Sequence, residues 1–259
     1  MTSEHIRIYI GTEPGNEKAE KALHWSIIES STVPIDLYWM SDKYTGSIWQ
    51  NWNKRRKTRE INTDSGWKTN FSSFRWVIPQ ACNFTGKAIY LDVDQIVLKD
   101  IKQMWNLPLN EHWVLAITQK RTDVMLMNCE KFKHEEWPTA PAMRDSGHSQ
   151  LIHRKRVQRL GSIGPLDKIY NCLDGEGYTP GTTRLIHYTI MRTQPWHPAP
   201  QYIKYEPHPL PEVESLWYRY YEKAIQFERK NNVALGSPEK YDSPVNVIGN
   251  ITSQAAKCE

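Results

Sequence analysis

The first forty residues alternate between short apolar runs and one longer amphipathic segment. Residues 6–10 are apolar and β-branched and predict a strand, and residues 17–30 carry apolar side chains at helical spacing after a Gly-containing turn at 11–15. Residues 34–39 are a second strand candidate at the expected separation. Strand, helix and strand in this order predict the opening of a parallel α/β unit.

The rest of the chain continues the pattern with interruptions. Further strands are predicted at 87–91, 112–118, 124–128 and 183–188, and helices at 71–80 and 212–232. The polar, basic stretch 41–69 predicts a long loop or insertion, and 135–169 shows no clear period. We therefore expect a main domain over 1–211 and a C-terminal amphipathic helix with a flexible tail over 212–259.

Two carboxylates one residue apart follow the most apolar strand candidate. Asp92 and Asp94 come directly after the run at 87–91, where open α/β sheets bind their ligands. Carboxylates this close repel one another, and a divalent cation relieves the repulsion. Mg²⁺ and Mn²⁺ commonly bind one or two carboxylates together with substrate phosphates. The alternative is an Asp that caps a helix beside a second Asp of no function.

His187 is a candidate third ligand, because it also lies at the end of a predicted strand. An imidazole added to two carboxylates shifts the metal preference from Mg²⁺ toward Mn²⁺. The alternative is a structural histidine at a strand end.

Composition excludes several classes of protein. The 259 residues include 39% hydrophobic and 24% charged residues with a net charge of +4, which indicates a globular chain with no general nucleic-acid-binding charge. The four cysteines have no paired short spacing, so neither a zinc site nor a disulfide framework is indicated. No secretory leader is evident, and no apolar run approaches the roughly 20 residues of a membrane helix. We expect a cytoplasmic protein without a transmembrane segment.

Four separate blocks resemble one family. They read TNFSSFR (69–75), IP (78–79), GKAIYLDVD (86–94) and KDI (99–101), and together they resemble the glycogenin-like and galactosyltransferase-like glycosyltransferases of family eight and their bacterial and phage relatives. The order of parts agrees over about residues 6–198. The resemblance implies the GT-A fold, a nucleotide-sugar Rossmann-like α/β fold with a mostly parallel central sheet flanked by helices. It also implies Mn²⁺ or Mg²⁺, a UDP-sugar donor and transfer that retains the anomeric configuration.

The resemblance also implies roles for individual residues. By position, Asp92, Asp94 and His187 become the metal ligands. The residues that it places at the donor are Gly11, Thr12, Glu13, Arg75, Asp92, Val93 and Asp94. Arg75 is expected to contact the donor, with a helix-surface arginine as the alternative, and Gln150 falls near a family carboxamide or acid beside the transferred sugar.

Two departures from the family pattern stand near these residues. The family usually reads His-x-x-Gly-x-x-Lys-Pro-Trp, whereas this chain reads HYTIMRTQPW (187–196), one residue longer and without the Gly or the Lys. Arg192 is expected to replace the Lys, because a guanidinium can hold phosphate oxygens with two donors. Asp123 stands where a Gly is usual, directly before the strand candidate 124–128.

Other functions stay open at this stage. A metal-dependent nucleotide- or sugar-binding relative without transfer is one alternative, and a phosphatase of the haloacid-dehalogenase type is another, although Asp92 lies far from the first strand that such enzymes use. The acceptor is an unknown glycan, lipid-linked sugar or protein. The loop with Trp49, Trp52 and Trp67 is the expected place for acceptor contacts.

Overall fold

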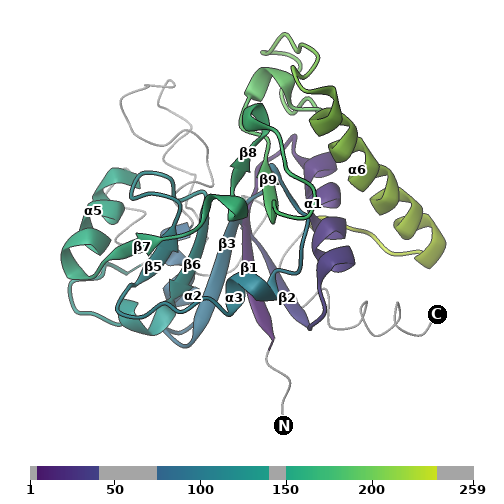
Figure 1. The fold of residues 1–259 in the computed structure, drawn as a ribbon. Coiled ribbons are helices and arrows are strands. Elements are labelled where there is room, and N and C mark those ends of the chain that lie inside the picture. Colours follow the sequence, from purple (N-terminus) through teal and green to yellow (C-terminus); the bar gives the residue numbers. More distant parts are fainter. Residues whose placement is uncertain (1–4, 41–74, 140–149, 238–259) are drawn as a thin grey trace.

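A central sheet carries the fold (Figure 1). The computed structural model describes residues 5–40, 75–139 and 150–237, and within them the sheet has six strands in the order β2-β1-β3-β6-β5-β7. In that order the strands are β2 (Ile35–Met40), β1 (Ile6–Gly11), β3 (Lys87–Asp92), β6 (Val124–Asn128), β5 (Val114–Ala116) and β7 (Ile163–Pro165). The predicted loop 41–69 and the first residues of the predicted helix, 71–74, lie outside the described residues.

The sheet is mostly parallel, as predicted, but one strand runs the other way. β1 is parallel to β2 and β3, and β5 is parallel to β7, whereas β6 is antiparallel to both β3 and β5. In the register of β3 and β6, Leu91 pairs with Val124. The beginning of β6 therefore lies at the carboxyl end of β3, and the residue before β6 lies beside Asp92.

A smaller sheet adjoins this edge. It has the order β4-β9-β8 and consists of β4 (Gln95–Val97), β9 (Leu185–His187) and β8 (Cys172–Leu173). β9 is the strand that the sequence predicts at 183–188. β4 and β8 were not predicted, because strands of two or three residues are too short to show a period. Gln95 pairs with His187, which brings β9 to the residue that follows Asp94.

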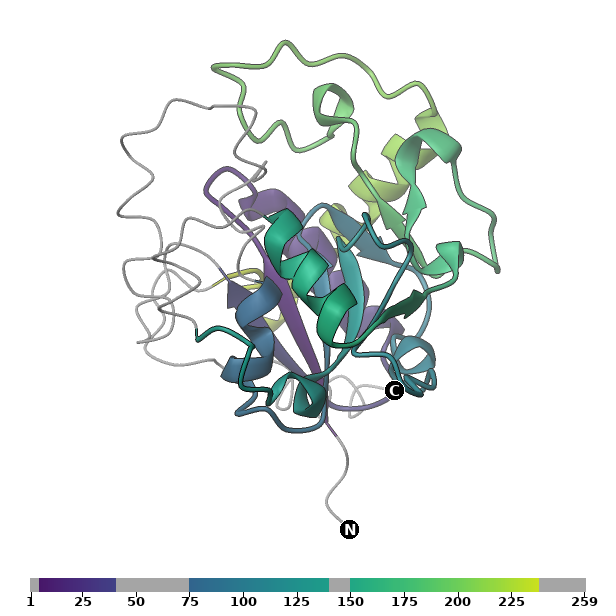
Figure 2. The same ribbon diagram turned by 90° about the vertical axis from the view of Figure 1, so that its left-hand side faces the viewer.

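Helices cover both faces of the main sheet (Figure 2). α1 (Glu17–Ser30) and α6 (Pro211–Asn231) lie on one face, and α2 (Ile78–Ala81) and α5 (Gln150–Leu160) lie on the other, while the short α3 (Lys102–Trp105) follows β4 in the chain. α1 has the predicted bounds, and α6 differs from its prediction by one residue at each end. α5 and β7 fall within 135–169, where polar and basic side chains leave no apolar stripe to indicate a helix.

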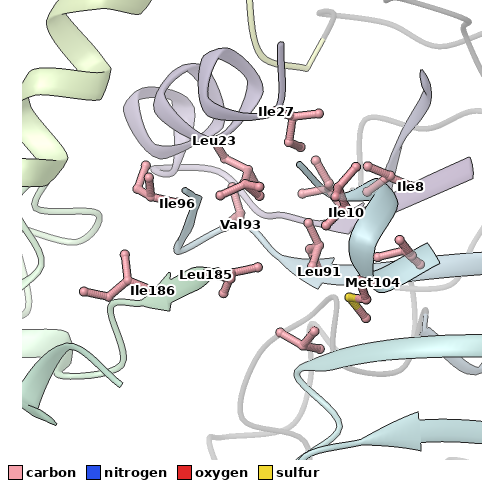
Figure 3. Close-up of a cluster of buried hydrophobic side chains, with 14 of the residues drawn as sticks. Ile8, Ile10, Leu23, Ile27, Leu91, Val93, Ile96, Met104, Leu185 and Ile186 are labelled. Carbon is pink, nitrogen blue, oxygen red and sulfur yellow. The ribbon is translucent and has the colours of Figure 1, made fainter. Parts of the chain in front are cut away.

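The core divides into two clusters because side chains alternate along the strands. Ile89 and Leu91 of β3 pack toward α1, in the cluster that Figure 3 shows around Leu23 and Ile27. Ala88 and Tyr90 point to the opposite face. The alternation places Asp92 on the face of Tyr90, away from α1. Val93 returns to the α1 cluster, where its side chain is 2% exposed.

α6 packs on α1 rather than standing apart. Trp25 meets Phe227 with ring centroids 4.7 Å apart, and Lys21 Nζ lies 2.7 Å from a carboxylate oxygen of Glu228. The first five residues of the predicted tail, 233–237, continue onto α1, where Leu235 is buried. Residues 238–259 lie outside the described part, and the boundary at residue 211 stays a prediction. No described helix has the length and apolar character that crossing a membrane requires.

His24 in α1 makes stability depend on pH. Burial lowers the pKa of His24 from 6.5 to about 3, and its Nδ1 accepts the Gly236 amide at 3.0 Å, so the ring is neutral in the folded chain. Between these two pKa values only the unfolded chain binds the proton, and the free energy of unfolding falls with decreasing pH by up to about 1.4 kcal/mol per pH unit. We expect His24→Gln to lose much less stability than the wild type between about pH 6.5 and about pH 5 in urea unfolding. As a control, His134→Gln replaces an exposed histidine and should keep the wild-type slope of the free energy of unfolding against pH. An unchanged slope in His24→Gln would contradict the assignment of this pH dependence to His24.

Candidate active site

The acidic pair lies where β3 ends and the chain bends into β4. Asp92 is the last residue of β3, and Gly11 of β1 is its neighbour in the sheet. The Val93 amide donates to the Gly11 carbonyl oxygen at 3.1 Å, while the Val93 side chain enters the core. This anchored residue separates the two acids and holds both at the edge of the sheet.

His187 completes a cluster with the two acids. Asp92, Asp94 and His187 each offer one ligand atom, and these atoms all lie within 4.8 Å of one another. His187 Nε2 is 2.9 Å from Asp94 Oδ1, but the contact lacks hydrogen-bond alignment, so this buried oxygen has no donor among the described residues. Two carboxylates and an imidazole around an unsatisfied oxygen form a ligand set that suits Mn²⁺ or another divalent ion.

Arg75 holds Asp92. Arg75 Nη2 is 3.0 Å from Asp92 Oδ1, Nη1 donates to the Thr122 carbonyl oxygen at 2.5 Å, and the guanidinium lies 4.5 Å from the centroid of the Tyr90 ring. The Tyr90 hydroxyl donates to the same carboxylate oxygen of Asp92. Burial raises the pKa of Asp92 to about 6, and the charge of Arg75 opposes the rise. Arg75 is 3% exposed, so the alternative of a helix-surface arginine is wrong.

The far nitrogen of His187 faces a third carboxylate. His187 Nδ1 is 3.0 Å from Asp123 Oδ2 and 3.0 Å from Asn171 Oδ1. Burial opposes protonation of the ring, but Asp94 and Asp123 outweigh it and raise the pKa of His187 well above its usual value. Burial also acts against the charge of Asp123, yet the contacts with His187 and Asn171 hold its pKa well below the usual range. His187 thus lies between two carboxylates, one on the side of each ring nitrogen.

The loop after β1 lies beside this cluster and is tied to the segment after β9. Thr12 is buried, and its hydroxyl donates to Glu20 Oε1 of α1 at 2.7 Å, whereas Glu13 is only partly exposed. Gly15 has φ +98°, and a Cβ there would come within 2.3 Å of the Pro198 carbonyl oxygen. This close approach requires glycine. The two segments therefore pack backbone against backbone.

The segment that departs from the family pattern reaches the cluster through a glutamine. Gln194, immediately before Pro195, is buried, and its Nε2 is 3.5 Å from Asp94 Oδ2 and donates to the Tyr188 carbonyl oxygen at 2.8 Å. Arg192, on the short helix η7 (Met191–Thr193), has an exposed side chain. Gln194 stands where the family pattern has Lys, directly before Pro195. Arg192, the predicted replacement for this Lys, lies two residues earlier.

Some predicted residues cannot be placed, and others were missed. Gln150 is the first residue of α5, but its side chain lies outside the described part, as do Trp49, Trp52 and Trp67. The missed residues beside the cluster are Gln95, Asp123, Asn171 and Gln194. The available signal for Asp123 was that it stands where the family pattern has glycine. Its position before a strand gave no signal, because ligands in open α/β sheets bind at the carboxyl ends of strands.

Comparison with known proteins gives the family. Residues 4–147, more than half of the chain, match the family model described as Glycosyl transferase family 8. The chain belongs to this family. The matched part includes Arg75, Asp92 and Asp94 and ends before His187, so the structure adds His187 to the cluster independently. The chain is therefore a glycosyltransferase, and the phosphatase alternative is excluded.

Individual relatives agree with this assignment. Protein CDI from Arabidopsis thaliana is 23% identical over 220 residues, which are 75% of this chain and 80% of that protein. The fold is similar to the bifunctional glycosyltransferase WbbM (TM-score 0.58, 13% identity, 87% of this chain and 52% of that one). It is also similar to the glycosyltransferase GlyE of Streptococcus pneumoniae TIGR4 (TM-score 0.57, 14% identity, 92% of this chain and 66% of that one). A third similar structure is the galactosyltransferase LgtC (TM-score 0.56, 12% identity, 85% of this chain and 96% of that one). This chain thus spans about half of WbbM and just under two thirds of GlyE, and these neighbours confirm the GT-A fold.

Arg75 should stabilise the folded chain through Asp92. Arg75→Met leaves a buried carboxylate without its cation and should lower the free energy of unfolding by about 3 kcal/mol near neutral pH. Adding Asp92→Asn should restore a large part of this loss, since the unpaired charge is then gone. Urea unfolding of both single variants and the double variant measures the coupling. As a control, Arg159→Met removes an exposed ion pair with Glu136 and should change the free energy of unfolding far less than Arg75→Met does. Strictly additive effects of the two site substitutions would contradict the pairing.

Proposed function

We propose that this glycosyltransferase takes its sugar from a UDP-sugar and requires a divalent cation, Mn²⁺ in preference to Mg²⁺, held by Asp92, Asp94 and His187. The observation that carries the proposal is the convergence of these three side chains within 4.8 Å at the carboxyl edge of the sheet. An imidazole beside two carboxylates favours Mn²⁺ over Mg²⁺. The buried oxygen of Asp94 that lacks a donor supports the same reading.

The surrounding residues prepare the site. When bound, the cation offsets the negative charge that grows on the leaving diphosphate. Arg75 and Tyr90 fix one oxygen of Asp92 and leave the other free to act as a ligand. Arg75 is proposed to orient Asp92 through this contact, and its expected contact with the donor stays a proposal.

The donor is proposed to lie along the β1 edge. Gly11 is the sheet neighbour of Asp92, so a nucleotide at the loop 11–13 would direct its diphosphate toward the acidic pair. The Thr12 hydroxyl donates to Glu20 Oε1, and the loop 11–13 is proposed to meet the uracil and ribose. Val93 can contribute only through its backbone, because its side chain lies in the core. Arg192, exposed near the end of β9, is proposed to meet the leaving phosphate, and Gln150 the transferred sugar.

Transfer is proposed to retain the anomeric configuration. In the proposed site Asp92 and Asp94 hold the cation and Asp123 faces His187, so none of these three carboxylates is assigned as a nucleophile. In a same-face displacement, the bond from the anomeric carbon to the phosphate oxygen breaks while the bond to the acceptor oxygen forms. The acceptor proton passes to the leaving phosphate. The acceptor is an unknown glycan, lipid-linked sugar or protein, and the cytoplasmic setting stays a prediction.

Metal-dependent binding of UDP tests the donor and the cation together. Calorimetry of the full chain with UDP should show tight binding with Mn²⁺ and much weaker binding without it. Asp94→Ala and Asp92→Asn should lose the metal-dependent part of the affinity, because each removes a ligand. Glu111→Ala removes an exposed carboxylate elsewhere and should bind like the wild type. Equal UDP binding with and without Mn²⁺ would contradict the proposal.

Slow hydrolysis of the donor distinguishes a transferase from a binding protein that has lost transfer, without knowledge of the acceptor. With Mn²⁺, we expect release of UDP from at least one of a panel of UDP-sugars, since water can replace the acceptor. The released sugar, followed by proton NMR, should first appear with the anomeric configuration of the donor. Binding of UDP without hydrolysis of any UDP-sugar would favour the binding protein, and an inverted first product would contradict retention.

A further inference from the structure

We infer that Asp123 is a positioning residue that, together with Asn171, holds the His187 ring with a protonated Nδ1, so that Nε2 is the nitrogen presented to the cation. The inference rests on the proposed function, because it concerns how this chain prepares one of the three proposed ligands. It concerns a position where the family pattern has glycine, which has no side chain to offer.

The geometry around His187 separates the two sides of the ring. Nε2 faces Asp94 at 2.9 Å, on the side of the proposed cation, and Nδ1 faces Asp123 and Asn171 at 3.0 Å each. His187 is 4% exposed, so water does not compete freely for either nitrogen. A histidine ligand whose second nitrogen donates to a carboxylate is a recurrent arrangement in metal sites, where the carboxylate fixes the ring and raises its basicity.

The amide of Asn171 is oriented by the same carboxylate. The Asn171 Nδ2 atom donates to Asp123 Oδ2 at 2.6 Å. If the amide were turned over, Asn171 Oδ1 would face Asp123 Oδ2, and two acceptor oxygens would then meet without a proton between them. With Nδ2 on Asp123, the Oδ1 atom of Asn171 must face His187. Two acceptors at 3.0 Å then converge on Nδ1. The Gln95 Nε2 atom is farther away, at 3.4 Å, and donates to the Asp123 carbonyl oxygen at 3.2 Å, so Nδ1 is inferred to carry a proton. Asp123 therefore determines which nitrogen is protonated, both directly and through Asn171.

Asp123 itself is fixed by the sheet. Its carbonyl oxygen accepts the Asp92 amide at 3.2 Å and the Gln95 side-chain amide at 3.2 Å, and Arg121 Nη2 lies 3.7 Å from its carboxylate. These contacts connect Asp123 to the strand that carries Asp92 and to the residue opposite His187. The carboxylate is 18% exposed and can move little. Glycine here would leave Asn171 Oδ1 as the one acceptor on Nδ1 among the described residues, and the orientation of the Asn171 amide would no longer be specified.

Binding of Mn²⁺ alone, in the absence of any nucleotide, tests this role. Loss of a partner behind a ligating histidine typically weakens metal binding by about 10- to 100-fold. We expect this loss in Asp123→Asn, which keeps the size and backbone of the residue, and a similar or larger loss in Asp123→Gly. Free Mn²⁺ is measured by electron paramagnetic resonance in a titration of the full chain. Asp36→Asn is the matched control, because it removes a carboxylate 2.9 Å from another histidine, His5, at the opposite end of the sheet.

The outcomes separate this inference from the proposed function. If the wild type does not bind Mn²⁺, both are overturned. If the wild type binds Mn²⁺ and His187→Ala weakens binding, but Asp123→Asn binds as tightly as the wild type, only the role of Asp123 is overturned. A purely structural Asp123 would lower the thermal midpoint of Asp123→Asn without changing the Mn²⁺ affinity of the folded fraction, which also overturns the inference.

A second measurement needs no variant. Nitrogen chemical shifts of the histidine rings in the wild type, recorded with the diamagnetic Mg²⁺ at saturation, should show His187 with a proton on Nδ1 and none on Nε2. Substitution of His187 assigns the signal. A proton on Nε2 in the metal-loaded chain would overturn the inference even if every variant at position 123 failed to fold.

Discussion

The crowding of three carboxylates at one edge of the sheet is the constraint on which the site depends. Asp92, Asp94 and Asp123 share a volume with two guanidiniums, those of Arg75 and Arg121, and one imidazole, that of His187. Carboxylates this close and this buried are unfavourable unless cations or hydrogen-bond donors compensate each of them. Arg75 lies against Asp92 and Arg121 lies 3.7 Å from Asp123, whereas Asp94 meets the shared imidazole of His187 and has no guanidinium beside it among the described residues. The structure thus combines local compensation with a remaining attraction for a cation.

Two features of the topology produce this crowding. The antiparallel direction of β6 brings the residue before that strand to the end of β3, and the pairing of β4 with β9 brings His187 beside Gln95. A β6 parallel to β3 would carry Asp123 to the opposite end of the sheet. The site is therefore a consequence of where a mostly parallel sheet meets one reversed strand and a small second sheet. The core residue Val93 anchors the chain at this junction.

The sequence predicted what local patterns can specify. β1, α1 and β3 were found from apolar periodicity, and the acidic pair was placed correctly because its chemistry and its strand are adjacent in the chain. His187 was a candidate ligand because it ends a predicted strand, and the family resemblance supported this place among the ligands. Asp123 and Asn171 were missed as partners of His187 because that relation depends on strand direction and on pairings of two or three residues, which leave no periodic signal. α5 was missed because basic residues hide its apolar positions.

The two departures from the family pattern meet in one place and act in the same direction. Gln194 stands where a lysine is usual and brings a neutral amide within 3.5 Å of Asp94. Asp123 stands where a glycine is usual and adds a carboxylate 3.0 Å from His187. Each change makes the surroundings of the cluster more negative by one charge. Under the proposed function, the cation and the exposed Arg192 must then offset more of the charge on the leaving diphosphate, since position 194 holds a glutamine and not a lysine. Under the same proposal, the Asp123 carboxylate strengthens His187 as a ligand of the cation. The cation in turn offsets the charge on the diphosphate that a lysine at position 194 would have offset.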